Sequence, residues 1–254
     1  MGKQEQVKPP HYIQLLNISD PQLIGILIGI LVILITTVLI LLWRRKKHAR
    51  RGVLLTGLCD AGKTLIYTRL LHNKFVQTHT SVKENVGDYE NNGSSLKIVD
   101  IPGHERLRGK FFDEYKTAAR GIMYVVDSNT VQKEIRDVAE YLYTLLSDAV
   151  VAKNSPPFLI VCNKQDQTMA KGSNVIRSLL EKEMNVLRTT KASQLESTNE
   201  IANNNTFLGK QDKEFEFDHL YPIKVDFVET CATKVDDENK SELEALEKWL
   251  FQIA

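Results

Sequence analysis

The chain has few cysteines and no large excess of charge of either sign. Its cysteines are Cys59, Cys162 and Cys231, an odd number that suits reduced thiols in a cytosolic domain better than a disulfide framework. The formal net charge of +1 excludes a strong overall attraction to nucleic acid, so we predict no direct nucleic-acid partner. The 254 residues leave room for one domain of about 150–200 residues plus appendages.

No basic stretch precedes the long apolar run near the start of the chain, which argues against a cleaved signal peptide. The run from Leu23 to Trp43 has 21 residues, no charge, and only Thr36 and Thr37 as polar side chains. As a helix it would be about 31 Å long, which matches the roughly 30 Å hydrocarbon core of a bilayer. We therefore predict a single transmembrane helix over 23–43.

Positive charge follows this run instead of preceding it. The segment Arg44–Arg51 carries six basic residues, whereas the preceding flank has only Lys3 and Lys8, offset by Glu5 and Asp20. Because basic flanks stay on the cytosolic side, we expect 1–22 on the far side of the membrane, 44–51 as a cytosolic linker and 52–254 as a cytosolic domain.

Beyond residue 52, short apolar runs alternate with amphipathic stretches. This pattern predicts an α/β domain, a mostly parallel sheet with helices on both faces. The predicted strands and helices are listed here by residue number: strands 52–56, 95–100, 122–127, 158–162 and 223–229; helices 63–74, 131–152 and 241–253. The segment at about 188–219 is rich in Ser, Thr and Asn and is predicted to be a flexible surface insertion.

The most specific motif follows the first predicted strand. Residues Gly57–Thr64 fit the phosphate-loop pattern G-x4-G-K-[ST], in which backbone N–H groups at a helix start hold the phosphates. Lys63 is predicted on the outer phosphates and Thr64 on Mg²⁺. The loop's predicted nucleotide-binding residues are Gly57, Cys59, Asp60, Ala61, Gly62, Lys63 and Thr64.

A second motif identifies the base. In Asn163-Lys164-Gln165-Asp166, the Asp166 carboxylate can accept hydrogen bonds from N1–H and the N2 amine of guanine. Adenine lacks this donor pair, and a site built on such contacts rejects the wrong base by roughly 10⁴-fold or more. We thus predict GTP and GDP as ligands, with Asn163, Lys164 and Asp166 at the base. The stretch Thr230–Ala232 resembles the loop behind guanine, which adds Cys231 and Ala232 to the site.

The third motif, Asp100-Ile101-Pro102-Gly103, is the D-x-x-G element of GTPases. Asp100 is predicted to act at the Mg²⁺ site, and the Gly103 N–H to bond the γ-phosphate. Thr80 is predicted to contact both Mg²⁺ and the γ-phosphate, with Thr78 as the alternative because no flanking pattern fixes the register.

His104 follows that glycine and is the candidate catalytic residue, because many GTPases carry a water-positioning glutamine there. A histidine either orients the attacking water or swings out of reach. No arginine is identifiable as a built-in finger for the transition-state charge, so slow intrinsic hydrolysis is predicted.

Together these motifs resemble the Arf/Sar branch of small GTPases. The amino-terminal apolar run, the Pro-Gly-His-Glu stretch at 102–105, and the segments Leu208–Lys210 and Lys213–Phe217 narrow the resemblance to the family of signal recognition particle receptor beta subunits. That resemblance implies a GTP-binding anchor at the endoplasmic reticulum membrane. The implied partner is the amino-terminal domain of the receptor's alpha subunit, docked across switch segments around 76–90 and 101–112.

Two alternatives remain open on the sequence. The first is an Arf-like switch that recruits coat proteins, against which a permanent membrane anchor argues. The second is a GTP-locked anchor in which the nucleotide is structural and hydrolysis is vestigial.

Overall fold

The computed structural model describes residues 21–48, 50–91, 94–197, 208–210, 212–233 and 241–254. It divides into two units, Met1–Ala49 and Arg50–Ala254. The first contains helix α1 (Pro21–His48), whose large apolar side chains between Leu27 and Leu41 are exposed. Among the residues that the structure describes, no helix is both long enough and apolar enough to cross a membrane. The transmembrane helix stays a prediction, and most of the predicted segment 1–22 lies outside the described residues.

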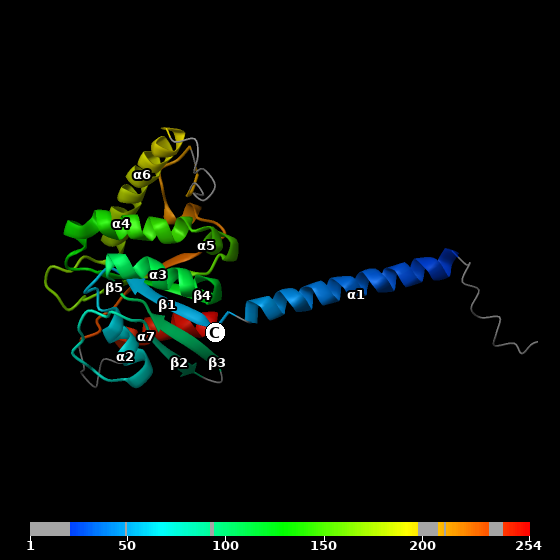
Figure 1. The fold of residues 1–254 in the computed structure, drawn as a ribbon, viewed down its shortest axis with the longest axis horizontal. Coiled ribbons are helices and arrows are strands. Elements are labelled where there is room, and N and C mark those ends of the chain that lie inside the picture. Colours follow the sequence, from blue (N-terminus) through cyan, green and yellow to red (C-terminus); the bar gives the residue numbers. More distant parts are fainter. Residues whose placement is uncertain (1–20, 49, 92–93, 198–207, 211, 234–240) are drawn as a thin grey trace, which may run out of the picture. The chain divides into compact units, whose positions relative to one another are not determined.

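The second unit is built on one six-stranded sheet with the order β2-β3-β1-β4-β5-β6 (Figure 1). Strand β2 pairs antiparallel with β3, and all the other neighbours pair parallel. The strands are β1 (Gly52–Gly57), β2 (Asn85–Asn91), β3 (Ser94–Asp100), β4 (Ala119–Asp127), β5 (Phe158–Asn163) and β6 (Val225–Glu229). The five predicted strands are present, with ends shifted by up to three residues.

Helices cover both faces of this sheet, as predicted. The helices are α2 (Lys63–His72), α3 (Glu105–Tyr115), α4 (Val131–Ser147), α5 (Ala149–Asn154), α6 (Ser173–Ser197) and α7 (Ser241–Ile253), with short 3-10 turns at Lys116–Ala118 and Phe217–His219. Alternate side chains of β1 enter two separate cores. Leu54 packs with α3, α4 and α6, while Val53 and Leu55 pack with α2 and α7. The predicted α/β architecture, a mostly parallel sheet with helices on both faces, is confirmed.

Two elements differ from the prediction. Strand β2 was not predicted, because an edge strand with polar residues such as Asn85, Asp88 and Glu90 lacks an apolar run. The single helix expected over 131–152 is two helices. The chain breaks at Asp148, whose Oδ1 accepts hydrogen bonds from the N–H groups of Val150 (2.8 Å) and Val151 (3.1 Å) and so caps α5.

The structure describes the two ends of the segment predicted as a flexible insertion, 188–219. Helix α6 continues to Ser197, and Leu208, Phe215 and Phe217 are buried in the core. Arg188 is also buried and donates to the carbonyl oxygens of Lys210 (2.9 Å) and Lys213. Both ends of the segment are therefore packed against the domain, and residues 198–207 lie outside the described residues.

Candidate functional site

The carboxyl ends of the parallel strands meet at one edge of the sheet, where open α/β sheets bind ligands. Strand register places Leu55 of β1 beside Asp100 of β3, and Asp127 of β4 beside Asn163 of β5. The loops that follow these strands carry the three sequence motifs. The motifs are thus brought together although about a hundred residues separate the first from the last.

The phosphate loop is a strained turn between β1 and α2. Gly62, the residue before the first turn of α2, has φ 91°, and Asp60 has φ 58°. A Cβ on Gly62 would lie 2.3 Å from Asn163 Nδ2, so only glycine fits there. The free N–H groups at the start of α2 therefore face the turn, which is the geometry that binds phosphate.

Lys63 brings a buried positive charge to this turn. Its side chain is 5% exposed, and its Nζ donates to the Leu58 carbonyl oxygen at 2.6 Å. Burial lowers the pKa of Lys63, against the opposing charge of Asp100. In the described part of the chain no carboxylate forms an ion pair with Lys63, which leaves its charge available for an anionic ligand.

The side chains at the predicted Mg²⁺ site lie next to Lys63. Thr64 Oγ1 donates to Asp100 Oδ2 at 2.8 Å, and Asn85 Nδ2 donates to the same oxygen at 2.9 Å. The other oxygen, Asp100 Oδ1, is buried and has no hydrogen-bond partner among the residues that the structure describes. Burial raises the pKa of Asp100, opposed by the hydrogen bonds from Asn85 and Thr64 and by the charge of Lys63.

These residues fit a hard cation such as Mg²⁺. A buried, unpartnered carboxylate oxygen beside a threonine hydroxyl is the kind of oxygen donor set that Mg²⁺ uses together with phosphates and water. The described residues contain no cluster of three or more His, Cys, Asp or Glu side chains that would hold a metal alone. The site thus suits a metal that arrives with a polyphosphate.

In the segment between α2 and β2, Ser81 lies against Thr64. Ser81 Oγ lies 3.2 Å from Thr64 Oγ1, whereas Thr80 and Thr78 are exposed. All three line a small cavity of about 50 Å³ with the phosphate loop and Gly103. No motif pointed to Ser81 or Asn85, and contact of Thr80 or Thr78 with Mg²⁺ and phosphate stays a prediction.

Gly103 and His104 follow β3 and precede α3. A Cβ on Gly103 would lie 2.6 Å from Lys63 Nζ and 2.7 Å from the Cys59 nitrogen, so this glycine is packed against the phosphate loop. His104 is exposed and caps α3, its Nδ1 accepting a hydrogen bond from the Arg106 N–H at 3.3 Å. Its catalytic role stays a prediction.

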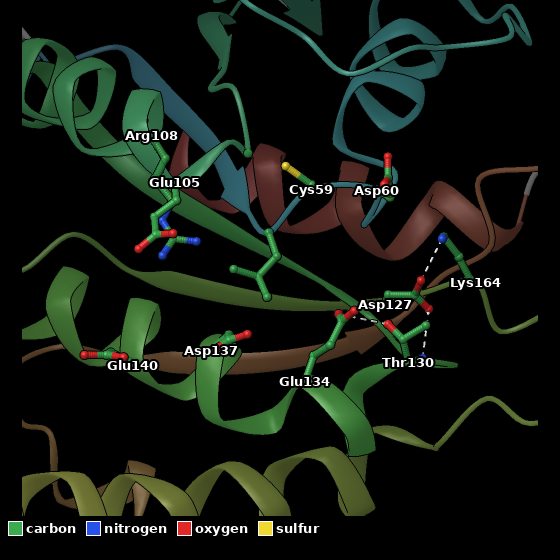
Figure 2. Close-up of a pocket in the computed structure, with 12 residues that line it drawn as sticks. Cys59, Asp60, Glu105, Arg108, Asp127, Thr130, Glu134, Asp137, Glu140 and Lys164 are labelled. Carbon is green, nitrogen blue, oxygen red and sulfur yellow. Dashed lines mark hydrogen bonds and ion pairs between the residues drawn. The ribbon is translucent and has the colours of Figure 1, made fainter.

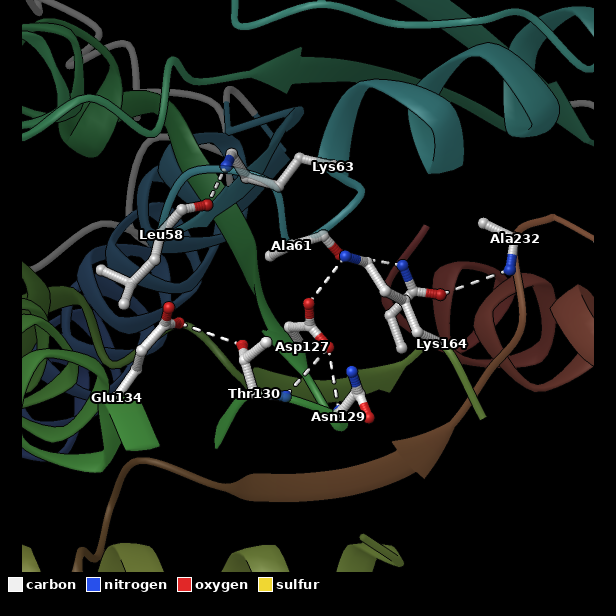
Figure 3. A network of polar contacts seen from close by, with 10 residues as sticks. Leu58, Ala61, Lys63, Asp127, Asn129, Thr130, Glu134, Lys164 and Ala232 are labelled. Atoms are coloured by element: carbon white, nitrogen blue, oxygen red, sulfur yellow. Dashed lines mark hydrogen bonds and ion pairs between the residues drawn. The ribbon is translucent and has the colours of Figure 1, made fainter. Parts of the chain in front are cut away.

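Asn163 joins its own loop to the phosphate loop and to the loop after β6. Its Nδ2 donates to the Ala61 carbonyl oxygen of the phosphate loop at 2.8 Å, and its Oδ1 accepts from the Ala232 N–H at 3.3 Å. Lys164 has φ 66° and its Nζ forms an ion pair with Asp127 Oδ2 at 2.6 Å (Figure 3). Asp127, for which no motif indicated a role, therefore holds Lys164 in place.

Asp166 is exposed and already oriented for a ligand. Thr233 Oγ1 donates to its Oδ2 at 3.0 Å, and Cys231 Sγ lies 3.2 Å from its Oδ1. Cys231 and Ala232 themselves are buried. The predicted residues of the base site thus lie together, and Thr233 adds a contact that the three-residue pattern missed.

A larger cavity of about 540 Å³ adjoins the phosphate loop between α3 and α4 (Figure 2). It shares Cys59, Asp60 and Gly103 with the smaller one. Arg108 of α3 lines it on one side, and Glu134, Asp137 and Glu140 of α4 line it on the other. All three cysteines of the chain are free thiols, as predicted, and only Cys59 is exposed.

Comparison with known proteins places this site in a family. The sequence profile of the signal recognition particle receptor beta subunit matches residues 48–225. The human signal recognition particle receptor subunit beta is 44% identical over 95% of this chain and 90% of its own length.

Solved structures agree with this match. The structure of the mammalian SRP receptor has a chain that is 44% identical, with a TM-score of 0.69 over 80% of this chain and 100% of that one. A Chaetomium thermophilum SRb-GTP/SRX complex has a TM-score of 0.60, covers 79% of this chain and 97% of that one, and at 21% identity shows the fold alone.

Proposed function

The chain belongs to the signal recognition particle receptor beta subunit family, and from this premise we propose that it is a membrane-anchored, GTP-binding receptor subunit. In this proposal the chain tethers the receptor's alpha subunit to the endoplasmic reticulum in a GTP-dependent way, for co-translational protein targeting. The GTP-binding part of this proposal rests on the position of Asn163, whose side-chain amide joins the phosphate loop to the loop predicted behind the base.

Each part of the ligand has a matching group in the site. Lys63 and the N–H groups of the α2 start suit the phosphates. Asp166, oriented by Thr233, suits the guanine edge. Thr64, Asp100 and the predicted switch residue Thr80 would hold Mg²⁺, which when bound supplies positive charge against the β- and γ-phosphates.

We expect slow hydrolysis in the protein alone. His104 is exposed, and its Nδ1 accepts the Arg106 N–H, so the ring must leave this cap before Nδ1 can orient a water molecule. A partner that moves the switch segment would supply that change. If no partner does so, the same observation favours the second candidate, a GTP-locked anchor whose nucleotide is structural.

The membrane part of the proposal rests on the sequence. The uncharged run from Leu23 to Trp43 and the basic segment Arg44–Arg51 support a single span with the GTPase domain in the cytosol. Because such an anchor is effectively permanent, the nucleotide is expected to control a protein surface and not membrane attachment.

The surface proposed to bind the alpha subunit is the switch region. Phe75, Val76 and Val82 are 53%, 46% and 72% exposed in the segment between α2 and β2. Exposed apolar side chains next to a nucleotide site suit a partner that senses the γ-phosphate. The 44% identity to a chain of the mammalian SRP receptor supports a role as a receptor subunit.

The test is a pulldown from solubilised endoplasmic reticulum membranes with the full chain in detergent, loaded with a GTP analogue or GDP. Recovery of the alpha subunit only with the analogue supports the proposal, and equal recovery with both supports the GTP-locked anchor. Recovery of coat components without the alpha subunit contradicts the proposed function. Val82→Asp is expected to abolish recovery, while Val175→Asp, at an exposed position of α6, serves as the matched control.

A further inference from the structure

Arg108 lines the large cavity beside the phosphate loop. It lies on α3, one turn after His104, and its guanidinium carbon is 4.2 Å from the centre of the Tyr141 ring. Six carboxylates line the same cavity: Asp60, Glu105, Asp127, Glu134, Asp137 and Glu140. Among the described residues none of them forms an ion pair with Arg108. The contact with the Tyr141 ring is therefore the interaction that places this side chain.

Tyr141 is fixed at its other end to the base of the phosphate loop. It is a residue of α4 with 5% exposure, and its hydroxyl lies 2.7 Å from the hydroxyl of the fully buried Thr56. Thr56 directly precedes Gly57, the first residue of the loop. Burial raises the pKa of Tyr141 to about 12, so the hydrogen bond is between neutral groups at physiological pH.

The residues just before α3 make a second contact with the phosphate loop. Gly103 is packed against Lys63 and Cys59 of the loop, and α3 begins two residues later at Glu105. The start of α3 is thus held near the loop directly through Gly103, and through Arg108, Tyr141 and Thr56.

We propose that Tyr141 is a positioning residue that links the switch helix α3 to the phosphate loop and thereby favours the nucleotide that carries a γ-phosphate. This inference rests on the proposed function and on the predicted hydrogen bond from the Gly103 N–H to the γ-phosphate. GDP has no such phosphate, so freeing α3 costs GTP affinity and leaves GDP affinity nearly unchanged. The expected loss for GTP is about 5–10-fold, in the lower range of coupling between sites.

The experiment compares the affinities of the full chain in detergent for a fluorescent non-hydrolysable GTP analogue and for fluorescent GDP. Arg108→Met keeps an unbranched apolar side chain but removes the cation from the Tyr141 ring. We expect about 5–10-fold weaker binding of the analogue and less than 2-fold change for GDP. Lys110→Met, on the exposed side of the same helix, is the matched control and should leave both affinities unchanged.

A second set of variants tests the link to Thr56. Tyr141→Phe alone leaves the buried Thr56 hydroxyl without its partner, so the melting temperature should fall. The double variant Tyr141→Phe/Thr56→Val removes both hydroxyls and should recover much of that stability. The selective loss of analogue binding is expected to persist in the double variant, which a purely structural role would not produce.

The outcomes separate this inference from the proposed function. Equal losses for both nucleotides in Arg108→Met, or no loss for either, would overturn the inference while the proposed function stands. A similar loss in Lys110→Met would also overturn it. If the unmodified chain bound neither guanine nucleotide, the proposed function and this inference would fall together.

Discussion

Single side chains at the nucleotide site carry costs in the ligand-free protein that a ligand would remove. Within the described residues, Lys63 is an ammonium buried without an ion pair, and Asp100 Oδ1 is a buried oxygen without a hydrogen-bond partner. Isolated buried charges and polar groups are destabilising. A polyphosphate with a divalent cation would satisfy both residues, which is why their positions indicate function and not stability.

The base specificity assigned to Asp166 is tested by Asp166→Asn. The variant replaces one of the two acceptor oxygens by an amide donor, so it faces the guanine N2 amine with the wrong group. We expect roughly 10²-fold or greater loss of GDP affinity, with improved binding of xanthosine diphosphate, whose C2 oxygen accepts the new donor. Competition with a fluorescent nucleotide measures both. Asp212→Asn, at an exposed position away from the motifs, should behave like the unmodified chain, and unchanged GDP affinity in Asp166→Asn would contradict the assignment.

The buried charge of Lys63 predicts a trade between stability and binding. Because burial holds its pKa in the fold below the usual lysine value of 10.5, the protonated form favours unfolding. Stability of the ligand-free protein should therefore rise as the pH increases from the lowered pKa toward about 10.5. Lys63→Met should remove this rise and increase the melting temperature at pH 7 by about 2–4 °C, the effect of ~1 kcal/mol in a domain of this size.

Thermal unfolding without nucleotide, followed against pH, checks this prediction. Nucleotide should no longer raise the melting temperature of Lys63→Met, because this variant lacks the ammonium group that would contact the outer phosphates. Lys74→Met, at an exposed position just after α2, is the control. A lower melting temperature in ligand-free Lys63→Met would show that the buried ammonium stabilises the fold.

At the scale of elements, capping decided what hydrophobic periodicity left unresolved. A periodic pattern runs through 131–152, but Asp148 accepts two backbone N–H groups and starts a new helix. Its Oδ2 also forms an ion pair with Lys116 at 2.7 Å. Asp148 therefore links the junction of α4 and α5 to the 3-10 turn Lys116–Ala118, which precedes β4.

Replacing Asp148 with Ala is expected to cost about 1–2 kcal/mol of unfolding free energy, mainly from the lost cap. Asp113→Ala separates the two contributions, because Asp113 forms an ion pair with the same Lys116 at 2.6 Å but caps no helix. Its loss should cost less than ~0.5 kcal/mol. Urea unfolding measures both variants, and equal costs would refute the capping explanation.

For the whole molecule, strand order unites the site. Loops after β1, β3, β5 and β6 meet at one sheet edge, so a nucleotide there would contact segments spread over most of Arg50–Ala254. Such a ligand binds the folded state alone, and at 100 times its Kd adds about 2.7 kcal/mol to stability. The domain should therefore unfold as one unit, at a temperature that depends on nucleotide.

Removal of Mg²⁺ tests this dependence. Chelation is expected to lower the melting temperature of the GDP-loaded protein, and Asp100→Ala should abolish the difference between chelated and Mg²⁺-containing samples. Asp88→Ala, on the exposed side of β2, should retain it. Scanning calorimetry measures the transition, and a Mg²⁺ effect that survives in Asp100→Ala would remove Asp100 from the metal site.

The sequence by itself determined the phosphate loop, the D-x-x-G element and the guanine motif, together with the parallel sheet. Each of these depends on a few consecutive residues whose spacing the ligand or the backbone dictates. Tertiary structure decided the contacts made across segments. Ser81 and Asn85 reach the Thr64–Asp100 pair, Asp127 holds Lys164, and the Arg108–Tyr141–Thr56 chain joins three elements. The aromatic residues of the 188–219 segment also find their core only in three dimensions. No local pattern encodes such pairs, because their partners are brought together only when the sheet order is set.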